Sequence, residues 1–154
     1  MTSAEISVYA ERLISEIAKL LPDCMQNAED RDNSRGNVTL FIVADTGQFF
    51  GKMFGDDRVR QRGTCRIAWQ KATQVWLTGM ATGRYEEAVY AKRVDPSKYG
   101  INHPDFIGWD GGLPVALEGG TRLSVAMSGF TGDTDCSVIR RAVAQIPGLK
   151  MAEG

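Results

Sequence analysis

The histidine at position 103 is the side chain that most directly offers acid–base or metal chemistry. It is the only histidine in the chain and stands in a polar segment, residues 102–105. There Asp105 or Asp110 could orient the imidazole of His103 as a general base, the ring could ligate iron, or it could be a surface histidine without a role. Because the chain has no second imidazole, HExxH zinc sites and multi-histidine metal centres are excluded.

A row of arginines offers anion binding. Arg58, Arg62 and Arg66 follow one another at intervals of four residues, which places them along one edge of a helix. Guanidinium groups bind carboxylates in a bidentate manner, so the row could hold an anionic small ligand. The alternative is a solvated helix face whose charge is balanced by Asp56 and Asp57.

The tryptophans offer stacking. Trp69 and Trp76 are seven residues apart, on the same face of the same expected helix, and Trp109 precedes a glycine-rich strand start. The three indoles could line one flat pocket for an aromatic ligand. The alternative is burial in the core or at a subunit interface.

A glycine-bounded loop, residues 129–132, precedes the last expected helix and directs backbone N–H groups toward its start. Gly129 and Thr131 could therefore contribute to a carboxylate site, unless Asp133 caps the helix and uses the same amides. Cys136 lies in the first turn of that helix, where the helix dipole favours thiolate. The flanking carboxylates of Asp133 and Asp135 oppose this effect, which favours a packed thiol.

Composition limits the classes of function. The chain has 154 residues, 43% of them hydrophobic, with a net charge of −1 and a pI near 5.8. These values predict a single domain over residues 1–154 and give no attraction to nucleic acid or anionic membranes. No apolar run reaches the length of a membrane span, and an acidic residue near the N-terminus is unlike a signal peptide, so we expect a cytoplasmic protein. Three cysteines without a CxxC pair predict reduced thiols.

The first half of the chain predicts a helix followed by a β-hairpin. Thr2 and Glu5 form a capping-box pattern, and apolar residues recur at helical spacing until Pro22. Residues 23–36 are polar and predict a surface loop. Residues 37–44 and 48–54 predict two antiparallel strands joined by a turn at 45–47, which Asp45 closes.

The second half predicts a long helix, a short helix, another hairpin and a last helix. Ala68, Ala72 and Val75 form a small apolar stripe on the helix expected over residues 57–80. Thr82 could cap the short helix, and Asp133 or Thr134 the last one. Strands are expected at 113–117 and 122–128, and a polar tail after residue 148. Helices alternating with hairpins indicate an α+β fold with an antiparallel sheet.

Four segments carry a resemblance to a known family. They are residues 43–47 (VADTG), 67–73 (IAWQKAT), 111–115 (GGLPV) and the loop 128–135. Over residues 37–143 the chain resembles the GlcG/HbpS-like haem-binding family and is also similar to the C-terminal domain of PduO proteins. The resemblance implies a profilin-like three-layer α/β/α fold with a five-stranded antiparallel sheet, homo-oligomerisation, and binding of haem or a corrinoid-related group. Asp45 and Lys71 match recurring positions of the family, but a turn-closing role and an apolar stem over the sheet explain them without catalysis.

This chain departs from the family at two places. Its long helix carries Trp69 and Trp76, and its first helix has no histidine, where relatives can supply an iron ligand. His103 is therefore the only histidine left to ligate haem iron.

Three functional hypotheses follow. The first is a small-molecule-binding protein that holds a planar, partly anionic ligand such as haem between the long helix and residues 103–112. Its ligand-binding residues would be Arg62, Arg66, Trp69, Trp109, Gly129 and Thr131. The second is a small enzyme that acts on an aromatic or hydroxy-acid metabolite, with His103 as general base and Asp105 as its partner. The third is an oligomeric scaffold without a ligand.

Overall fold

A computed structural model describes residues 1–101, 105 and 107–152 of the chain. Its helices and strands follow the predicted order, with an α-helix, a 3₁₀ helix and a strand added. The elements are α1 (Ser3–Cys24), α2 (Ala28–Ser34), β1 (Val38–Ala44), β2 (Phe49–Phe54), α3 (Arg58–Thr78), α4 (Thr82–Tyr90), the 3₁₀ helix η1 (Pro96–Tyr99), β3 (Gly112–Leu117), β4 (Arg122–Ser128), α5 (Gly132–Ala144) and β5 (Leu149–Met151).

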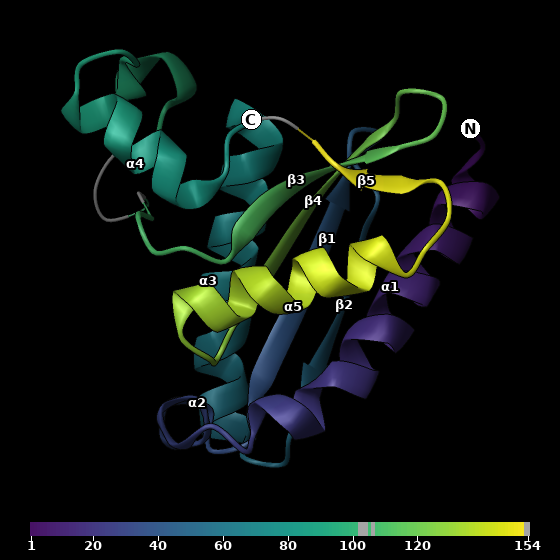
Figure 1. The fold of residues 1–154 in the computed structure, drawn as a ribbon. Helices are drawn as coiled ribbons and strands as arrows, with labels where there is room; N and C mark the ends of the chain where they lie inside the picture. Colours follow the sequence, from purple (N-terminus) through teal and green to yellow (C-terminus); the bar gives the residue numbers. More distant parts are fainter. Residues whose placement is uncertain (102–104, 106, 153–154) are drawn as a thin grey trace.

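The strands form one five-stranded sheet in the order β2-β1-β4-β3-β5, and every neighbouring pair is antiparallel. The two predicted hairpins meet at the centre, where Phe41 of β1 pairs with Ala126 of β4. Helices α1 and α5 lie in front of the sheet in Figure 1 and α3 lies behind it. This is the three-layer α/β/α arrangement with an antiparallel five-stranded sheet that the family resemblance implies, and that expectation is confirmed.

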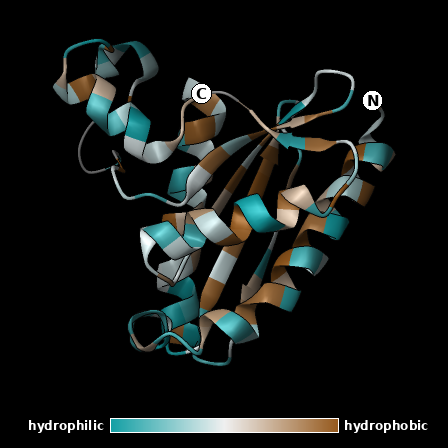
Figure 2. Ribbon diagram, viewed as in Figure 1, coloured by the Kyte–Doolittle hydropathy of each residue, from teal (hydrophilic) through white to brown (hydrophobic). Residues whose placement is uncertain are grey.

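The main core lies between the sheet and the pair α1 and α5. Because side chains alternate along a strand, one set of β1 and β4 residues, including Leu40 and Val125, faces this layer and is fully buried. Ile6, Leu13 and Ile17 of α1 pack against them. Figure 2 shows these hydrophobic residues along the strands, with hydrophilic residues on the outside of α1.

The other face of the sheet is covered mainly by α3. Ala68, Ala72 and Val75 are buried there, as the predicted stripe requires, and Ala72 packs with Val43 and Ala126 of the sheet. A helix is about 10 Å across, whereas five strands about 4.8 Å apart span about 20 Å. One helix therefore leaves the margins of this face open, and hollows lie on both sides of α3.

Two predicted boundaries in the first part of the chain are wrong. Pro22 lies inside α1, which continues to Cys24. Proline has no backbone N–H to donate, but because Pro22 is in the last turn, the helix loses this hydrogen bond only near its end. The stretch 23–36, expected to be a loop, contains α2. Asn27 caps α2 by accepting a hydrogen bond from the backbone N–H of Asp30 at 3.1 Å.

The predicted caps of the last two helices are also wrong. Ala81 is the N-cap residue of α4, because the Thr82 hydroxyl instead bonds the Trp109 carbonyl at 2.7 Å and the Gly112 N–H at 3.3 Å. Thr131, not Asp133 or Thr134, is the N-cap residue of α5. The polar tail contributes β5, which pairs with β3. Within the described ranges, no helix is both long and apolar enough to cross a membrane.

Candidate functional site

A cleft opens between α3 and the β1–β2 hairpin, on the margin that α3 leaves uncovered. We call it the outer cleft. Its volume is about 600 Å³, and its lining residues are Phe41, Met53, Arg58, Gln61, Arg62, Cys65, Arg66 and Trp69. The apolar surface comes from Phe41, which stacks on Phe49 with 5.9 Å between ring centroids, and from the half-exposed side chains of Met53 and Trp69. Such surface is available to the flat face of a ligand.

The arginine row forms one side of the outer cleft. Arg58, Arg62 and Arg66 are exposed, and none of them forms an ion pair within the part of the chain that the structure describes. Asp57, which the sequence offered as a partner, caps α3 and lies 3.9 Å from the guanidinium of Arg60 instead. The positive charge of the cleft is therefore not balanced by a bound carboxylate.

A second cavity lies on the other side of α3, between α3, residues 108–110 and the loop that leads into α5. We call it the inner cavity. Its volume is about 730 Å³, and its lining residues are Asn33, Thr64, Ile67, Lys71, Gly108, Trp109, Asp110, Ser128, Gly129, Phe130, Thr131, Gly132 and Asp133. Trp109 is 68% exposed and forms part of its rim.

One loop amide of the inner cavity, that of Thr131, is held by a carboxylate that the sequence analysis missed. Asp30 of α2 is buried, and its Oδ1 accepts the Thr131 N–H at 2.9 Å while its Oδ2 accepts the Thr134 hydroxyl at 2.7 Å. The Thr131 hydroxyl in turn caps α5 by accepting the Thr134 N–H at 3.3 Å. The amide of Thr131 is therefore already bound by Asp30, and Asp133 is exposed and does not cap α5. The contribution of Gly129 to a carboxylate site stays a prediction. The spacing of Asn27 and Asp30 was a helix-start pattern that pointed to α2.

Lys71 and Asp135 form a buried pair at the floor of the inner cavity. The Lys71 Nζ donates to the Met127 carbonyl at 2.9 Å and lies 3.5 Å from the Asp135 Oδ2, and the two residues are 3% and 1% exposed. Burial raises the pKa of Asp135 to about 7, against the lowering effects of Lys71 and the Phe130 N–H. Among the residues that the structure describes, the Asp135 Oδ1 has no hydrogen-bond partner.

This placement corrects the interpretation of Lys71 as an apolar stem with a solvated head. The ammonium group itself is inside the protein, because a backbone carbonyl and a carboxylate replace its water. Sequence spacing could not show this, since Lys71 and Asp135 are far apart in the chain and meet only across the sheet.

The remaining sequence candidates are dispersed. Asp105 is exposed and lines a small groove of about 250 Å³ together with Trp69 and Trp76. His103 lies outside the described residues. Cys136 is buried, and burial first and Asp110 second raise the pKa of its thiol, in agreement with a packed thiol.

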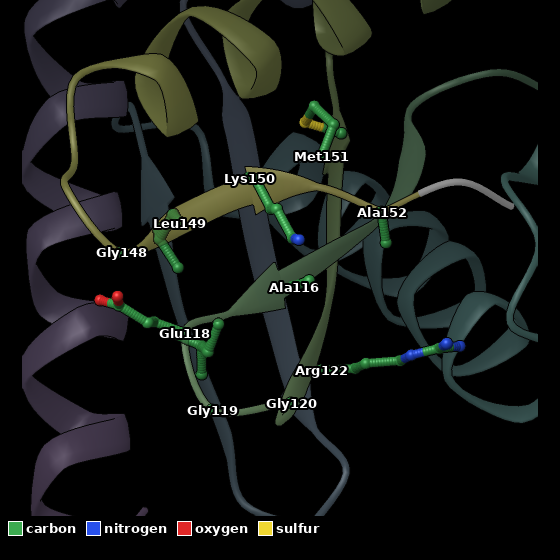
Figure 3. Close-up of a pocket in the computed structure, with 11 residues that line it drawn as sticks. Ala116, Glu118, Gly119, Gly120, Arg122, Gly148, Leu149, Lys150, Met151 and Ala152 are labelled. Carbon is green, nitrogen blue, oxygen red and sulfur yellow. The ribbon is translucent and has the colours of Figure 1, made fainter.

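A third hollow lies along the β3–β4 turn and β5, at the opposite edge of the sheet, with a volume of about 1070 Å³. Figure 3 shows the charged ends of Glu118 and Arg122 extending to opposite sides of it, with Lys150 between them. It contains none of the predicted site residues.

The structure thus divides the six predicted ligand-binding residues between two cavities. Arg62, Arg66 and Trp69 line the outer cleft, whereas Trp109, Gly129 and Thr131 line the inner cavity. The helix α3 lies between the two cavities. One side of the helix faces β2 and the other faces the loop before α5, and the two sides carry different residues. Within the described residues, no group of three or more histidine, cysteine or acidic side chains could hold a metal ion.

Comparison with protein families decides the relationship. The model of the family described as "Haem degrading protein HbpS-like" matches residues 16–144, which is most of the chain. The chain belongs to the HbpS-like family. No curated protein matches it significantly in sequence.

Solved structures with the same fold agree with this assignment. A crystal structure of a PduOC:heme complex has a TM-score of 0.62 at 15% identity, over 90% of this chain and 96% of that chain. A structure of HbpS has a TM-score of 0.55 at 16% identity, over 86% and 87%. A double mutant of HbpS from Streptomyces reticuli has a TM-score of 0.52 at 17% identity, over 86% and 84%. At these identities the likeness shows that the HbpS-like chain shares their fold.

Proposed function

We propose that this HbpS-like protein binds a planar, partly anionic small molecule of the haem type in the outer cleft. The observation that carries the proposal is the combination of an apolar surface with a row of arginines that no carboxylate balances. A flat ligand with acidic substituents needs both features in one cleft. The volume of about 600 Å³ lies within the range of small-molecule sites, roughly 300–1,000 Å³.

Each part of the cleft has a role toward such a ligand. Arg62 and Arg66 would bind its carboxylates through bidentate, charge-assisted hydrogen bonds. Phe41, Met53 and Trp69 would pack against its flat face and remove apolar surface from water. The half-exposed state of Trp69 is then the state before ligand binding, because a stacked ligand would cover it.

The side chains of the outer cleft also fit haem in their donor chemistry. Met53 contributes a thioether and Cys65 a free thiol, and both sulfur types ligate haem iron in proteins. When bound, haem would supply a redox-active iron. His103 is the alternative iron ligand that the sequence offers, so variants must distinguish histidine from sulfur ligation.

The comparisons support this ligand class without identifying it. The HbpS-like family is described as haem-degrading, and one structural neighbour is a heme complex. These statements concern other proteins, at 15% identity for that neighbour. For this chain the arginine row is the independent support, since it lies on residues that the sequence analysis selected by spacing alone.

Titration of the purified protein with hemin, followed by absorbance, tests the proposal. We expect a saturable Soret shift at one equivalent per chain. The Arg62→Ala/Arg66→Ala double variant should bind at least about tenfold more weakly, because each lost charge-assisted bond is worth roughly 1.5–3 kcal/mol. Arg60→Ala is the matched control, since Arg60 lies on the same helix and pairs with Asp57. The absence of a saturable shift in the wild type would overturn the proposal.

Further variants locate the ligand and its iron ligand. Trp109→Ala should leave the affinity for hemin unchanged, because Trp109 lines the inner cavity. A loss of affinity in Trp109→Ala but not in the double arginine variant would move the ligand to that cavity. Comparison of His103→Ala, Met53→Leu and Cys65→Ser by the position of the Soret band identifies the axial ligand.

A further inference from the structure

We propose that Lys71 is a reactive amine that forms an imine with a small, neutral aromatic aldehyde or ketone bound in the inner cavity. This site is separate from the outer cleft, and the proposal does not depend on haem binding. It rests on a buried amine at the floor of a cavity, on the carboxylate beside it and on the character of the cavity walls.

The amine group of Lys71 reaches the cavity from its floor. Lys71 is 3% exposed and lines a cavity of about 730 Å³. The Lys71 Nζ occupies the space over Gly111, since a Cβ at Gly111 would lie 2.6 Å from it, so a larger residue there would displace the amine. An ammonium group has three hydrogens, and the described residues provide two acceptors, the Met127 carbonyl and Asp135. The third hydrogen is available to a carbonyl oxygen in the cavity.

Asp135 is placed to move the protons that imine formation requires. The carboxylate first takes a proton from the Lys71 ammonium, and the neutral amine then attacks the carbonyl carbon. The C–N bond forms as the C=O π bond breaks, and a proton moves from the nitrogen to the oxygen to give a carbinolamine. Protonated Asp135 returns its proton to the carbinolamine hydroxyl, the C–O bond breaks, and water leaves. The products are a protonated imine, one water and the carboxylate. Asp135 thus returns to its ionised form, and the reaction needs no other proton donor or acceptor.

Two features of Asp135 suit this role. Its Oδ1 is buried and has no hydrogen-bond partner within the described part of the chain, so it can accept or donate a proton without breaking a bond seen there. Burial brings its pKa to about 7, near the operating pH of a proton-transferring group. The charged or titratable groups around it are Lys71 of α3, Asp30 of α2, Cys24 of α1 and Cys136 of its own helix.

The walls of the inner cavity select the ligand class. Ile67, Trp109 and Phe130 offer apolar and aromatic surface, which favours an aromatic ring. The carboxylates of Asp110 and Asp133 also line the cavity and disfavour an anionic ligand such as a keto acid. A neutral aromatic carbonyl compound satisfies both conditions.

Reductive trapping tests the proposal. The protein is incubated with benzaldehyde and cyanoborohydride, and the benzylated lysines are located by peptide mass spectrometry. We expect saturable modification of Lys71 at benzaldehyde concentrations where exposed Lys52 and Lys150 react only in proportion to concentration. Lys71→Arg is the matched variant, because it keeps the positive charge and forms no reducible imine. Labelling of Lys71 no faster than that of Lys52 and Lys150 in the folded protein would overturn the proposal.

Two more measurements separate a reactive pair from a structural one. Asp135→Asn should slow the trapping of Lys71 by on the order of a hundredfold and remove its pH dependence near pH 7, because proton transfer is lost. Circular dichroism of both variants shows whether they fold. An unchanged trapping rate in folded Asp135→Asn would exclude the proton-transfer role. Trapping with glyoxylate as efficient as with benzaldehyde would contradict the proposed ligand class.

Discussion

Asp135 and Lys71 illustrate how burial changes the chemistry of individual residues. A carboxylate in water titrates well below neutral pH, but here the loss of hydration raises its pKa more than the neighbouring ammonium lowers it. The Asp135 carboxyl therefore titrates close to neutral pH. A surface ion pair of the same residue types would not have this property.

The raised pKa of Asp135 predicts a specific pH dependence of stability. The pKa is about 7 in the folded protein and 3.8 as the ordinary value, so the folded state binds this proton more tightly. The resulting stabilisation is complete below about pH 4 and is lost as the pH rises through 7. We therefore compare the unfolding free energy of the wild type with that of Asp135→Asn. The wild-type value minus the variant value should fall between pH 4 and pH 7. A shift of one pKa unit corresponds to about 1.4 kcal/mol, so the fall should be a few kcal/mol at most. Urea denaturation at several pH values measures it.

Asp133→Asn is the control for this experiment. Asp133 is exposed on the same turn of α5. The unfolding free energy of the wild type minus that of Asp133→Asn should therefore stay nearly constant with pH. The unfolding free energy of the wild type minus that of Asp135→Asn could instead increase with pH. That result would mean that the ionised Lys71–Asp135 pair stabilises the fold more than the protonated carboxyl does, and it would contradict the direction of the pKa shift.

At the scale of elements, α3 organises both cavities. The small residues of α3 bring the helix close to β1 and β4. On one side of the helix β2 stays uncovered, and on the other side the loop before α5 faces the helix across the inner cavity. The arginines and Trp69 lie on one side of the helix, and Thr64, Ile67 and Lys71 on the other. The depth of both cavities thus depends on how closely α3 approaches the sheet.

A pair of substitutions in α3 tests this dependence. Ala72→Leu should destabilise the protein by about 1–3 kcal/mol, because the buried stripe has no space for the larger side chain. Gly63→Ala, in the same helix, should stabilise it by roughly 0.5–1 kcal/mol, since a Cβ there meets nothing within 4 Å. Urea denaturation measures both changes. A neutral effect of Ala72→Leu would show that α3 can move away from the sheet without cost.

For the whole molecule, the distribution of apolar surface indicates self-association. Outside the outer cleft, large exposed hydrophobic side chains also lie on α3 and β2; they include Phe49, Trp76 and Leu77. Exposed apolar surface of this kind marks an interaction site. We propose that it forms the interface of a homo-oligomer.

Trp76→Glu should shift the protein to smaller species in sedimentation velocity, because a carboxylate in an apolar interface is left unpaired. Trp76 is 44% exposed. Val8→Glu is the matched control, since Val8 is also an exposed apolar residue but lies on α1, in the layer on the other side of the sheet. A monomeric wild type at micromolar concentration would contradict the proposal.

Local patterns were sufficient to predict most elements of this fold. The capping box at Thr2, the apolar run of β1 and the stripe of Ala68, Ala72 and Val75 each depend on residues that are close together in the chain. The arginine row was readable for the same reason, because a helix places every fourth residue on one side. The strand β5 is too short to show such a pattern, and only the family resemblance pointed to a fifth strand.

The sequence by itself therefore determined most of the secondary structure, the two antiparallel hairpins, and the arginine row and apolar stripe of α3. Only the tertiary structure decided that Asp30 holds the start of α5, that Lys71 meets Asp135, and that Trp109 and Arg66 line different cavities. The physical reason is distance along the chain. Helix and strand periods are set by neighbouring residues, whereas burial, pKa and cavity walls depend on contacts between segments that meet only when the layers pack.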